Sequence, residues 1–121
     1  MPLVEKAEYI KEPTDLQCGQ AVLAMLSGLT VPEIINMVGT DRETNLKKML
    51  SALDTLGIEY KTERIAVADK TQLSSVCILS LETPRCWHWS LYFDGVFYDP
   101  EHGIMDDFPI CNRKYYWEIL V

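Results

Sequence analysis

The chain has 121 residues, 48% of them hydrophobic and 24% charged, which is typical of a soluble globular protein with a single domain over residues 1–121. Its net charge of −7 and its lack of a basic cluster argue against nucleic acid or an anionic membrane surface as a partner. The chain shows no apolar run of the roughly 20 residues that span a bilayer and no signal peptide, so we expect a cytoplasmic protein with four reduced cysteines.

The first half of the chain predicts three helices, each followed by a glycine that can end it: Gly28, Gly39 and Gly57. Residues 14–17, Thr-Asp-Leu-Gln, fit a capping box for the first helix, whose apolar stripe begins at Cys18. Residues 30–33 repeat the capping signal for the second helix, with a proline in its first turn. The third helix is expected to begin within residues 40–44.

The second half changes to the patterns of strands and short turns. Residues 58–67 alternate loosely, residues 69–75 fit a short helical turn, and residues 76–81 form an apolar run typical of a buried strand. An Asp-Gly turn joins two aromatic runs within residues 88–99, and residues 114–121 predict a closing strand. Helices followed by antiparallel strands indicate an α+β domain, with the helices packed on an antiparallel sheet.

The hairpin within residues 88–99 brings two polar residues together. A two-residue loop at Asp94-Gly95 fixes the register and places Ser90 opposite Asp99. His88 then lies on the same face as Asp99, as its diagonal neighbour, with Cβ atoms about 7 Å apart or less. An aspartate there can accept a proton from one imidazole nitrogen, fix the tautomer and favour the imidazolium. The alternative is a structural histidine that only pairs with nearby backbone.

Two other residues near the hairpin are not expected to take part. Asp94 lies about 20 Å along the strand from His88, too far for contact. His102 follows Pro100, and continued strand alternation would place it on the opposite face from Asp99, so it is expected in a loop.

Cys18 stands in the first turn of the first predicted helix. The helix dipole and the free N–H groups at that end stabilise a thiolate, and the N–H of Cys18 itself can hold an oxyanion. Gly19 would leave the approach to the sulfur open. The alternative is that Cys18 is simply part of the apolar stripe that it heads.

The remaining cysteines predict no chemistry of their own. Cys77 lies inside an apolar strand, and Cys111 lies in a loop near the end of the chain. Cys86 and His88 could form a metal-ligand pair, but no second pair has the spacing of a zinc site. We therefore predict no metal and no cofactor.

The stretches EPTDLQCGQAVLAMLSG (12–28) and HWSLYFDGVFYDP (88–100) together resemble the papain-like cysteine peptidase superfamily, and within it the bacteriocin-processing, double-glycine leader peptidases. Small phage and bacterial proteins share this pattern. The resemblance covers residues 10–105 and implies a minimal papain-like fold. It also implies that Cys18 is the nucleophile, that His88 is the general base and later the acid, and that Asp99 orients the imidazole.

One position departs from the family pattern. The family places an oxyanion-hole glutamine six residues before the cysteine, and this chain has Glu12 there. A carboxylate is a poor oxyanion donor unless it is protonated. Gln17 is the expected substitute, and the alternative for its side chain is a role in the capping box. Gln20 is less suited, because it points along the helix away from its N-terminus.

The expected function is a thiol-dependent hydrolase that cleaves a peptide or isopeptide bond in a protein or peptide substrate, through a Cys-His-Asp triad and a thioester. The same triad would serve a glutamine deamidase or transamidase. A binding module that keeps the fold with little activity is the second alternative, and Glu12 favours it. The third is a structural domain with incidental polar residues. The sequence assigns no oligomeric state.

Overall fold

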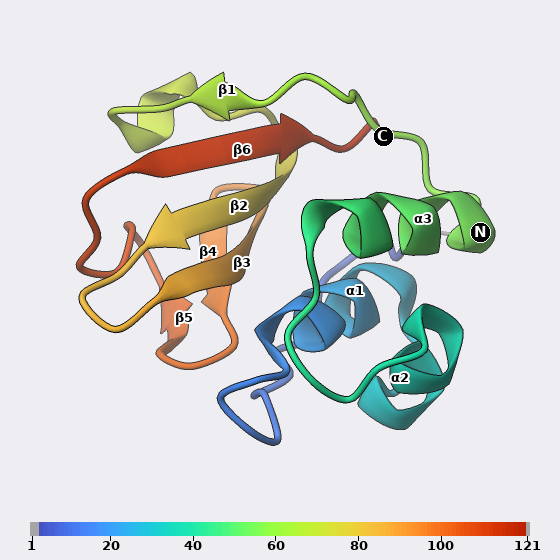
Figure 1. Ribbon diagram of the computed structural model, residues 1–121. Helices are drawn as coiled ribbons and strands as arrows, with labels where there is room; N and C mark the ends of the chain where they lie inside the picture. Colours follow the sequence, from blue (N-terminus) through green and yellow to red (C-terminus); the bar gives the residue numbers. More distant parts are fainter. Residues whose placement is uncertain (1–2, 121) are drawn as a thin grey trace.

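Three helices precede a six-stranded antiparallel sheet in residues 3–120, the part of the chain that the computed structural model describes (Figure 1). The chain is therefore an α+β protein, as predicted. The helices are α1 (Cys18–Ser27), α2 (Val31–Val38) and α3 (Leu46–Leu56). The strands are β1 (Ile65–Ala66), β2 (Val76–Glu82), β3 (Trp87–Phe93), β4 (Val96–Asp99), β5 (Gly103–Met105) and β6 (Lys114–Glu118). They lie in the order β1-β6-β2-β3-β4-β5.

The glycine stop signals of the three helices are confirmed. The residue that ends each helix has φ in the left-handed region, where glycine is favoured: Gly28 (78°), Gly39 (79°) and Gly57 (73°). The capping box of α2 is also confirmed, because Glu33 N–H donates to Thr30 Oγ1 at 3.3 Å and Thr30 N–H donates to Glu33 Oε1 at 3.1 Å.

The starts of the other two helices differ from the prediction. No capping box precedes α1: the Gln17 side chain makes no cap hydrogen bond, and Thr14 Oγ1 accepts from Leu16 N–H in the turn before the helix. α3 begins at Leu46 rather than within residues 40–44, because Asn45 caps it by accepting from Lys48 N–H at 2.9 Å. A short side chain that bonds the backbone two or three residues on fits either a cap or a turn.

Most of the strand predictions are confirmed. β2 covers the apolar run, and a 3₁₀ turn covers Lys70–Gln72. β6, the last strand in the chain, lies inside the sheet between β1 and β2. The stretch 58–67 contributes only the two residues of β1 and a single bridge from Tyr60 to Ile119. Residue 121, the last of the predicted closing strand, lies outside the described residues.

The β3–β4 hairpin has the predicted turn and register. Phe93 pairs with Val96 and Leu91 with Tyr98. Both turn residues have positive φ, 48° at Asp94 and 88° at Gly95, as a type I′ turn requires. The register that places His88 beside Asp99 is therefore the observed one.

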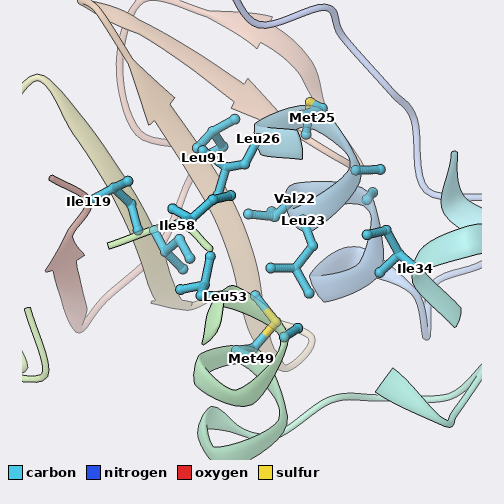
Figure 2. Close-up of a cluster of buried hydrophobic side chains, with 14 of the residues drawn as sticks. Val22, Leu23, Met25, Leu26, Ile34, Met49, Leu53, Ile58, Leu91 and Ile119 are labelled. Carbon is cyan, nitrogen blue, oxygen red and sulfur yellow. The ribbon is translucent and has the colours of Figure 1, made fainter. Parts of the chain in front are cut away.

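The sheet carries a hydrophobic cluster on each face. The larger one joins α1, α2 and α3 to β2 and β3, and Figure 2 shows Leu23, Met49 and Leu91 within it. Every residue of α1 except Ser27 is buried. The smaller cluster includes Leu79, Leu81 and Phe97 on the opposite face. Because side chains alternate along β3, His88 and Ser90 lie on that opposite face, while the backbone of β3 stays against α1.

Within residues 3–120, no single helix is both long enough and apolar enough to cross a membrane. α1 and α2 reach that length and composition only as a pair, across a bend of 111°.

Candidate active site

A cleft of about 380 Å³ opens where the N-terminal end of α1 meets the start of β3. It is lined by segments that are far apart in the sequence. These are the approach to α1 (Glu12, Asp15, Leu16, Cys18), the α2–α3 loop (Glu43, Thr44), Ser80 of β2, residues 85–89, and Glu101. The cleft therefore contains Cys18 and His88 together, as the sequence predicted.

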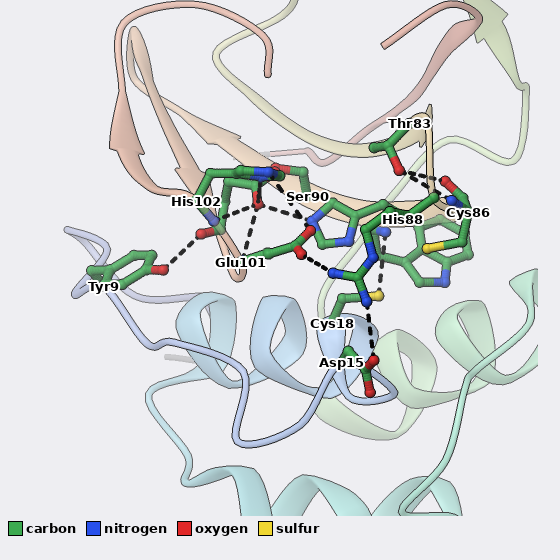
Figure 3. A network of polar contacts seen from close by, with 12 residues as sticks. Tyr9, Asp15, Cys18, Thr83, Cys86, His88, Ser90, Glu101 and His102 are labelled. Atoms are coloured by element: carbon green, nitrogen blue, oxygen red, sulfur yellow. Dashed lines mark hydrogen bonds and ion pairs between the residues drawn. The ribbon is translucent and has the colours of Figure 1, made fainter. Parts of the chain in front are cut away.

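His88 and Asp99 form a buried pair beside this cleft (Figure 3). Their side chains are 4% and 0% exposed, and Nε2 of His88 lies 2.9 Å from Oδ1 of Asp99. The pairing expected from the hairpin register is thus observed. Because Nε2 pairs with Asp99, Nδ1 is the ring nitrogen left for Cys18.

The pair is ionised at neutral pH. Burial by itself would lower the pKa of His88, but its hydrogen bond to Asp99, the nearby Cys18 sulfur, and the charges of both groups raise that pKa to about 10. Burial would likewise raise the pKa of Asp99, but its hydrogen bonds with His88, His102 and Ser90 lower it to about 2. An imidazolium therefore faces Cys18.

Asp99 accepts more hydrogen bonds than the sequence suggested. Its Oδ2 accepts from Ser90 Oγ at 2.9 Å, and its Oδ1 accepts from the N–H groups of Glu101 and His102, each at 3.0 Å. Nδ1 of His102 also lies 2.9 Å from Oδ1. This carboxylate is held from several directions, which fixes the imidazole that it orients.

His102 corrects one expectation. It does lie in a loop, but it is part of the site, because the chain turns sharply between Asp99 and Gly103 and strand parity no longer applies. The sequence DPEHG (99–103) carried a signal for this turn: an aspartate whose side chain accepts backbone N–H groups two and three residues on, and a closing glycine with φ of 99°.

Cys18 is the first residue of α1, as predicted. The N–H of Trp89 donates to its Sγ at 3.4 Å, which stabilises negative charge on the sulfur. The first helical bond runs from Ala21 N–H to the Gln17 carbonyl, so the N–H of Cys18 lies ahead of it, at the end of the helix that attracts anions. These features suit a thiolate and an oxyanion that forms beside it.

Gly19 is required for a different reason than expected. A Cβ at this position would lie 2.1 Å from Thr44 Oγ1 and 3.2 Å from Cδ1 of Trp89. The glycine therefore lets the α2–α3 loop and β3 pack against the first turn of α1. It does not clear an approach to the sulfur, because the space beside it is filled.

Gln17 is not placed as an oxyanion donor. It does not line the cleft, and its Nε2 donates to the Asp41 carbonyl at 2.9 Å. Gln20 is similar: its Nε2 donates to the carbonyls of Thr40 and Arg42, at 3.0 and 2.8 Å. The two amides fasten the α2–α3 loop, which forms one wall of the cleft. Spacing along the chain gave no signal for this role.

Glu12 does line the cleft. Its N–H donates to the Pro100 carbonyl at 2.9 Å, and its side chain is 8% exposed. Oε1 of Glu12 has no hydrogen-bond partner among residues 3–120. Burial raises the pKa of Glu12; the positive charge of His88 opposes this shift, while nearby carboxylates add to it.

An ion-paired arginine lines the cleft. Arg85, from the β2–β3 turn, bonds Glu101 through Nη1 at 2.6 Å and Asp15 through Nη2 at 3.1 Å. It thereby ties the turn after β4 to the approach to α1 (Figure 3). No local pattern predicts this bridge, because Glu101 and Asp15 lie 16 and 70 residues from Arg85 along the chain.

Three side chains of the site offer atoms that a metal ion could bind. The ligand atoms of His88, Asp99 and His102 lie within 4.8 Å of one another. However, Oδ1 of Asp99 already accepts from both imidazoles and two backbone N–H groups. The arrangement is explained by hydrogen bonding without an ion.

The other three cysteines differ from Cys18 in their surroundings, and all four are free thiols. Cys77 is buried in β2, and burial raises its pKa to about 12. Burial also raises the pKa of Cys111. Cys86 is exposed and lines the same cleft as Cys18, which makes it a natural control for reactivity.

Neither a protein-family model nor a curated protein sequence matches this chain.

Proposed function

We propose that the chain is a thiol-dependent hydrolase that cleaves a peptide or isopeptide bond in a protein or peptide substrate. The observation that carries the proposal is the buried His88–Asp99 pair, with Nε2 and Oδ1 2.9 Å apart, beside a cysteine that begins a helix. The resemblance to papain-like cysteine peptidases points to the same three residues. A reducing compartment such as the cytoplasm would suit a thiol nucleophile.

In the first half of the reaction, Sγ of Cys18 attacks the substrate carbonyl carbon, and the electrons of the C=O double bond move to the oxygen. The N–H of Cys18 holds that oxyanion. The intermediate collapses, the C–N bond breaks, and the amine leaves with the proton that His88 donates from Nδ1. A thioester on Cys18 remains.

In the second half, neutral His88 takes a proton from a water molecule, which attacks the thioester. The C–S bond breaks, the carboxylic acid leaves, and the thiolate–imidazolium pair is restored. Asp99 remains ionised throughout, and its hydrogen bond to Nε2 keeps Nδ1 aimed at the sulfur.

The test is a peptide library incubated with the wild-type chain and with Cys18→Ala, and read by mass spectrometry. Peptide-bond hydrolysis creates new termini that depend on Cys18. Conversion of glutamine to glutamate, also dependent on Cys18, would instead assign the deamidase reaction that the same triad can perform. Cys86→Ala is the matched control and should behave as wild type. Identical peptide patterns from wild type and Cys18→Ala would contradict the proposal.

A further inference from the structure

Glu12 presents an unexplained buried group to the cleft. Its side chain is 8% exposed and lines the same cleft as Cys18, yet Oε1 has no hydrogen-bond partner among residues 3–120. A buried carboxylate without donors is unfavourable, and such groups usually take up a proton instead. A buried carboxyl group in this state calls for an explanation, and its place in the lining of the cleft that holds Cys18 points to a role in that cleft.

The charges around Glu12 act on its pKa in both directions, whereas burial favours its neutral form. Burial is the main cause that raises its pKa, and Glu101, Asp99 and Asp15 raise it further. The positive charge of His88 on β3 is the largest of the charge effects, and it lowers the Glu12 pKa. Arg85, the other cation that lines the cleft, is paired with Glu101 and Asp15. A protonated carboxyl group carries an O–H that can donate a hydrogen bond, and a buried carboxylic acid can serve as an oxyanion donor.

The cleft needs such a donor. The N–H of Cys18 supplies one hydrogen bond to the oxyanion, and oxyanion holes commonly combine a backbone N–H with a side-chain donor. The amides of Gln17 and Gln20 are engaged by the α2–α3 loop. Thr44 also has an unpartnered hydroxyl, but that oxygen lies against Gly19, within the packing of α1.

We propose that Glu12, in its protonated form, donates the second hydrogen bond to the oxyanion that forms when Cys18 attacks a carbonyl group. This inference rests on the proposed function and gives it a pH dependence. The oxyanion hole is complete only while Glu12 holds its proton. The activity is therefore highest at pH values below the Glu12 pKa and falls as Glu12 ionises.

The test uses N-acetylglycinal, a small aldehyde, as the probe. The sulfur of Cys18 adds to the aldehyde carbon, and the oxygen accepts the proton of the His88 imidazolium, which gives a neutral hemithioacetal with its oxygen in the hole. His88, still paired with Asp99, then takes up a proton from solvent; this uptake is common to all variants, so the Glu12 effect is read as the difference between wild type and Glu12→Gln at each pH. A probe labelled with ¹³C at the aldehyde carbon reports the adduct by NMR. Its affinity is measured from about pH 4 to pH 8, where His88 remains protonated in the free protein.

Relative to Glu12→Gln, whose amide always donates, we expect the wild-type affinity to fall about tenfold or more as the pH rises through the Glu12 pKa. Glu12→Ala should bind more weakly than Glu12→Gln at every pH. Glu8→Gln, a change at an exposed glutamate on the same segment, should match wild type.

Three results would overturn the inference: a pH-dependent loss in Glu12→Gln equal to that of wild type, full affinity in Glu12→Ala, or a loss that follows Thr44→Val instead. If the Glu12 variants do not fold, the Glu12 carboxyl carbon is titrated by NMR in the wild type. Adduct formation should then raise the Glu12 pKa, and an unchanged titration would refute its role. A wild-type chain that forms no adduct on Cys18 would refute the proposed function itself.

Discussion

Asp99 connects more of the site than any other side chain. It accepts from the imidazole of His88, the hydroxyl of Ser90 and two backbone N–H groups of the turn after β4, and it is fully buried. The same carboxylate therefore stabilises the turn, fixes the imidazole and keeps it charged. Its effects on stability and on reactivity are expected to appear together.

Asp99→Asn tests this coupling. The change keeps the shape but removes the charge that compensates buried His88, so we expect the free energy of unfolding to fall by about 3 kcal/mol. The measurement is urea unfolding at neutral pH. Asp106→Asn, at an exposed aspartate, is the control. Equal stabilities of the two variants would show that the Asp99 charge contributes little.

The His88 pKa predicts how stability changes with pH. Because that pKa rises from 6.5 to about 10 on folding, the folded state binds the proton more tightly. The stabilisation is complete below pH 6.5 and is lost as the pH rises toward 10. Asp99 acts at the other end: its pKa falls from 3.8 to about 2, so its contribution is complete above pH 3.8 and is lost as the pH falls toward 2.

His88→Gln should flatten the alkaline part of this profile. The urea midpoint of the wild type is expected to decline between about pH 7 and pH 10, while that of the variant declines much less. Both are measured under the same salt conditions. A variant whose midpoint declines in parallel with wild type would place the titrating group elsewhere.

At the scale of secondary-structure elements, the first turn of α1 is the part that assembles the cleft. Gly19 allows Thr44 and Trp89 to approach it, and the ring N–H of Trp89 donates to the Thr44 carbonyl at 3.1 Å. The amides of Gln17 and Gln20 hold the same loop from the helix side. The α2–α3 loop is thus fixed by α1 and β3 together.

Gly19→Ala should destabilise the protein although alanine is the better helix former. Alanine would gain about 1 kcal/mol from propensity, but its Cβ would lie 2.1 Å from Thr44 Oγ1. We expect a net loss of about 1–3 kcal/mol, measured by thermal or urea unfolding. Thr44→Ala added to Gly19→Ala should recover part of the loss. A Gly19→Ala variant that is more stable than wild type would mean that the α2–α3 loop shifts to accommodate the added Cβ at little cost.

Gln20→Leu should loosen the loop. Its two carbonyl partners, at Thr40 and Arg42, would lose their donor inside the protein, at a cost of about 1 kcal/mol for each partly buried hydrogen bond. Trypsin cleavage after Arg42 under native conditions is therefore expected to accelerate about tenfold. Cleavage after exposed Arg64 serves as the internal control. Unchanged cleavage after Arg42 would show that Gln20 does not restrain the loop.

At the scale of the whole molecule, the sequence predicted what local rules determine. A two-residue turn fixes a hairpin register, so the His88–Asp99 pair followed from the Asp94-Gly95 dipeptide. Periodicity and glycine stops placed α1, with Cys18 as its first residue. The class of the fold followed from the order of these patterns along the chain.

The rest of the site depends on tertiary packing that no local rule encodes. The Arg85 bridge joins residues 70 and 16 positions away in the chain. The Gln17 and Gln20 amides bond carbonyls of a loop 20 to 24 residues downstream. Gly19 also had a packing role that its neighbours in sequence could not reveal. Only His102 had a local signal, in the turn that follows β4.

The central claim is that Cys18 is an activated nucleophile, and its alkylation tests this most directly. The folded chain is treated with iodoacetamide from about pH 5 to pH 9, and each cysteine is quantified by peptide mass spectrometry. Cys86, exposed in the same cleft, is the comparison, and Cys77 should react slowest because burial raises its pKa to about 12.

We predict that at about pH 6 Cys18 reacts at least tenfold faster than Cys86, and that His88→Ala abolishes the difference. That result would establish a thiolate sustained by the imidazolium. A Cys18 that reacts no faster than Cys86 at any pH, or one whose rate is unaffected by loss of His88, would contradict the account.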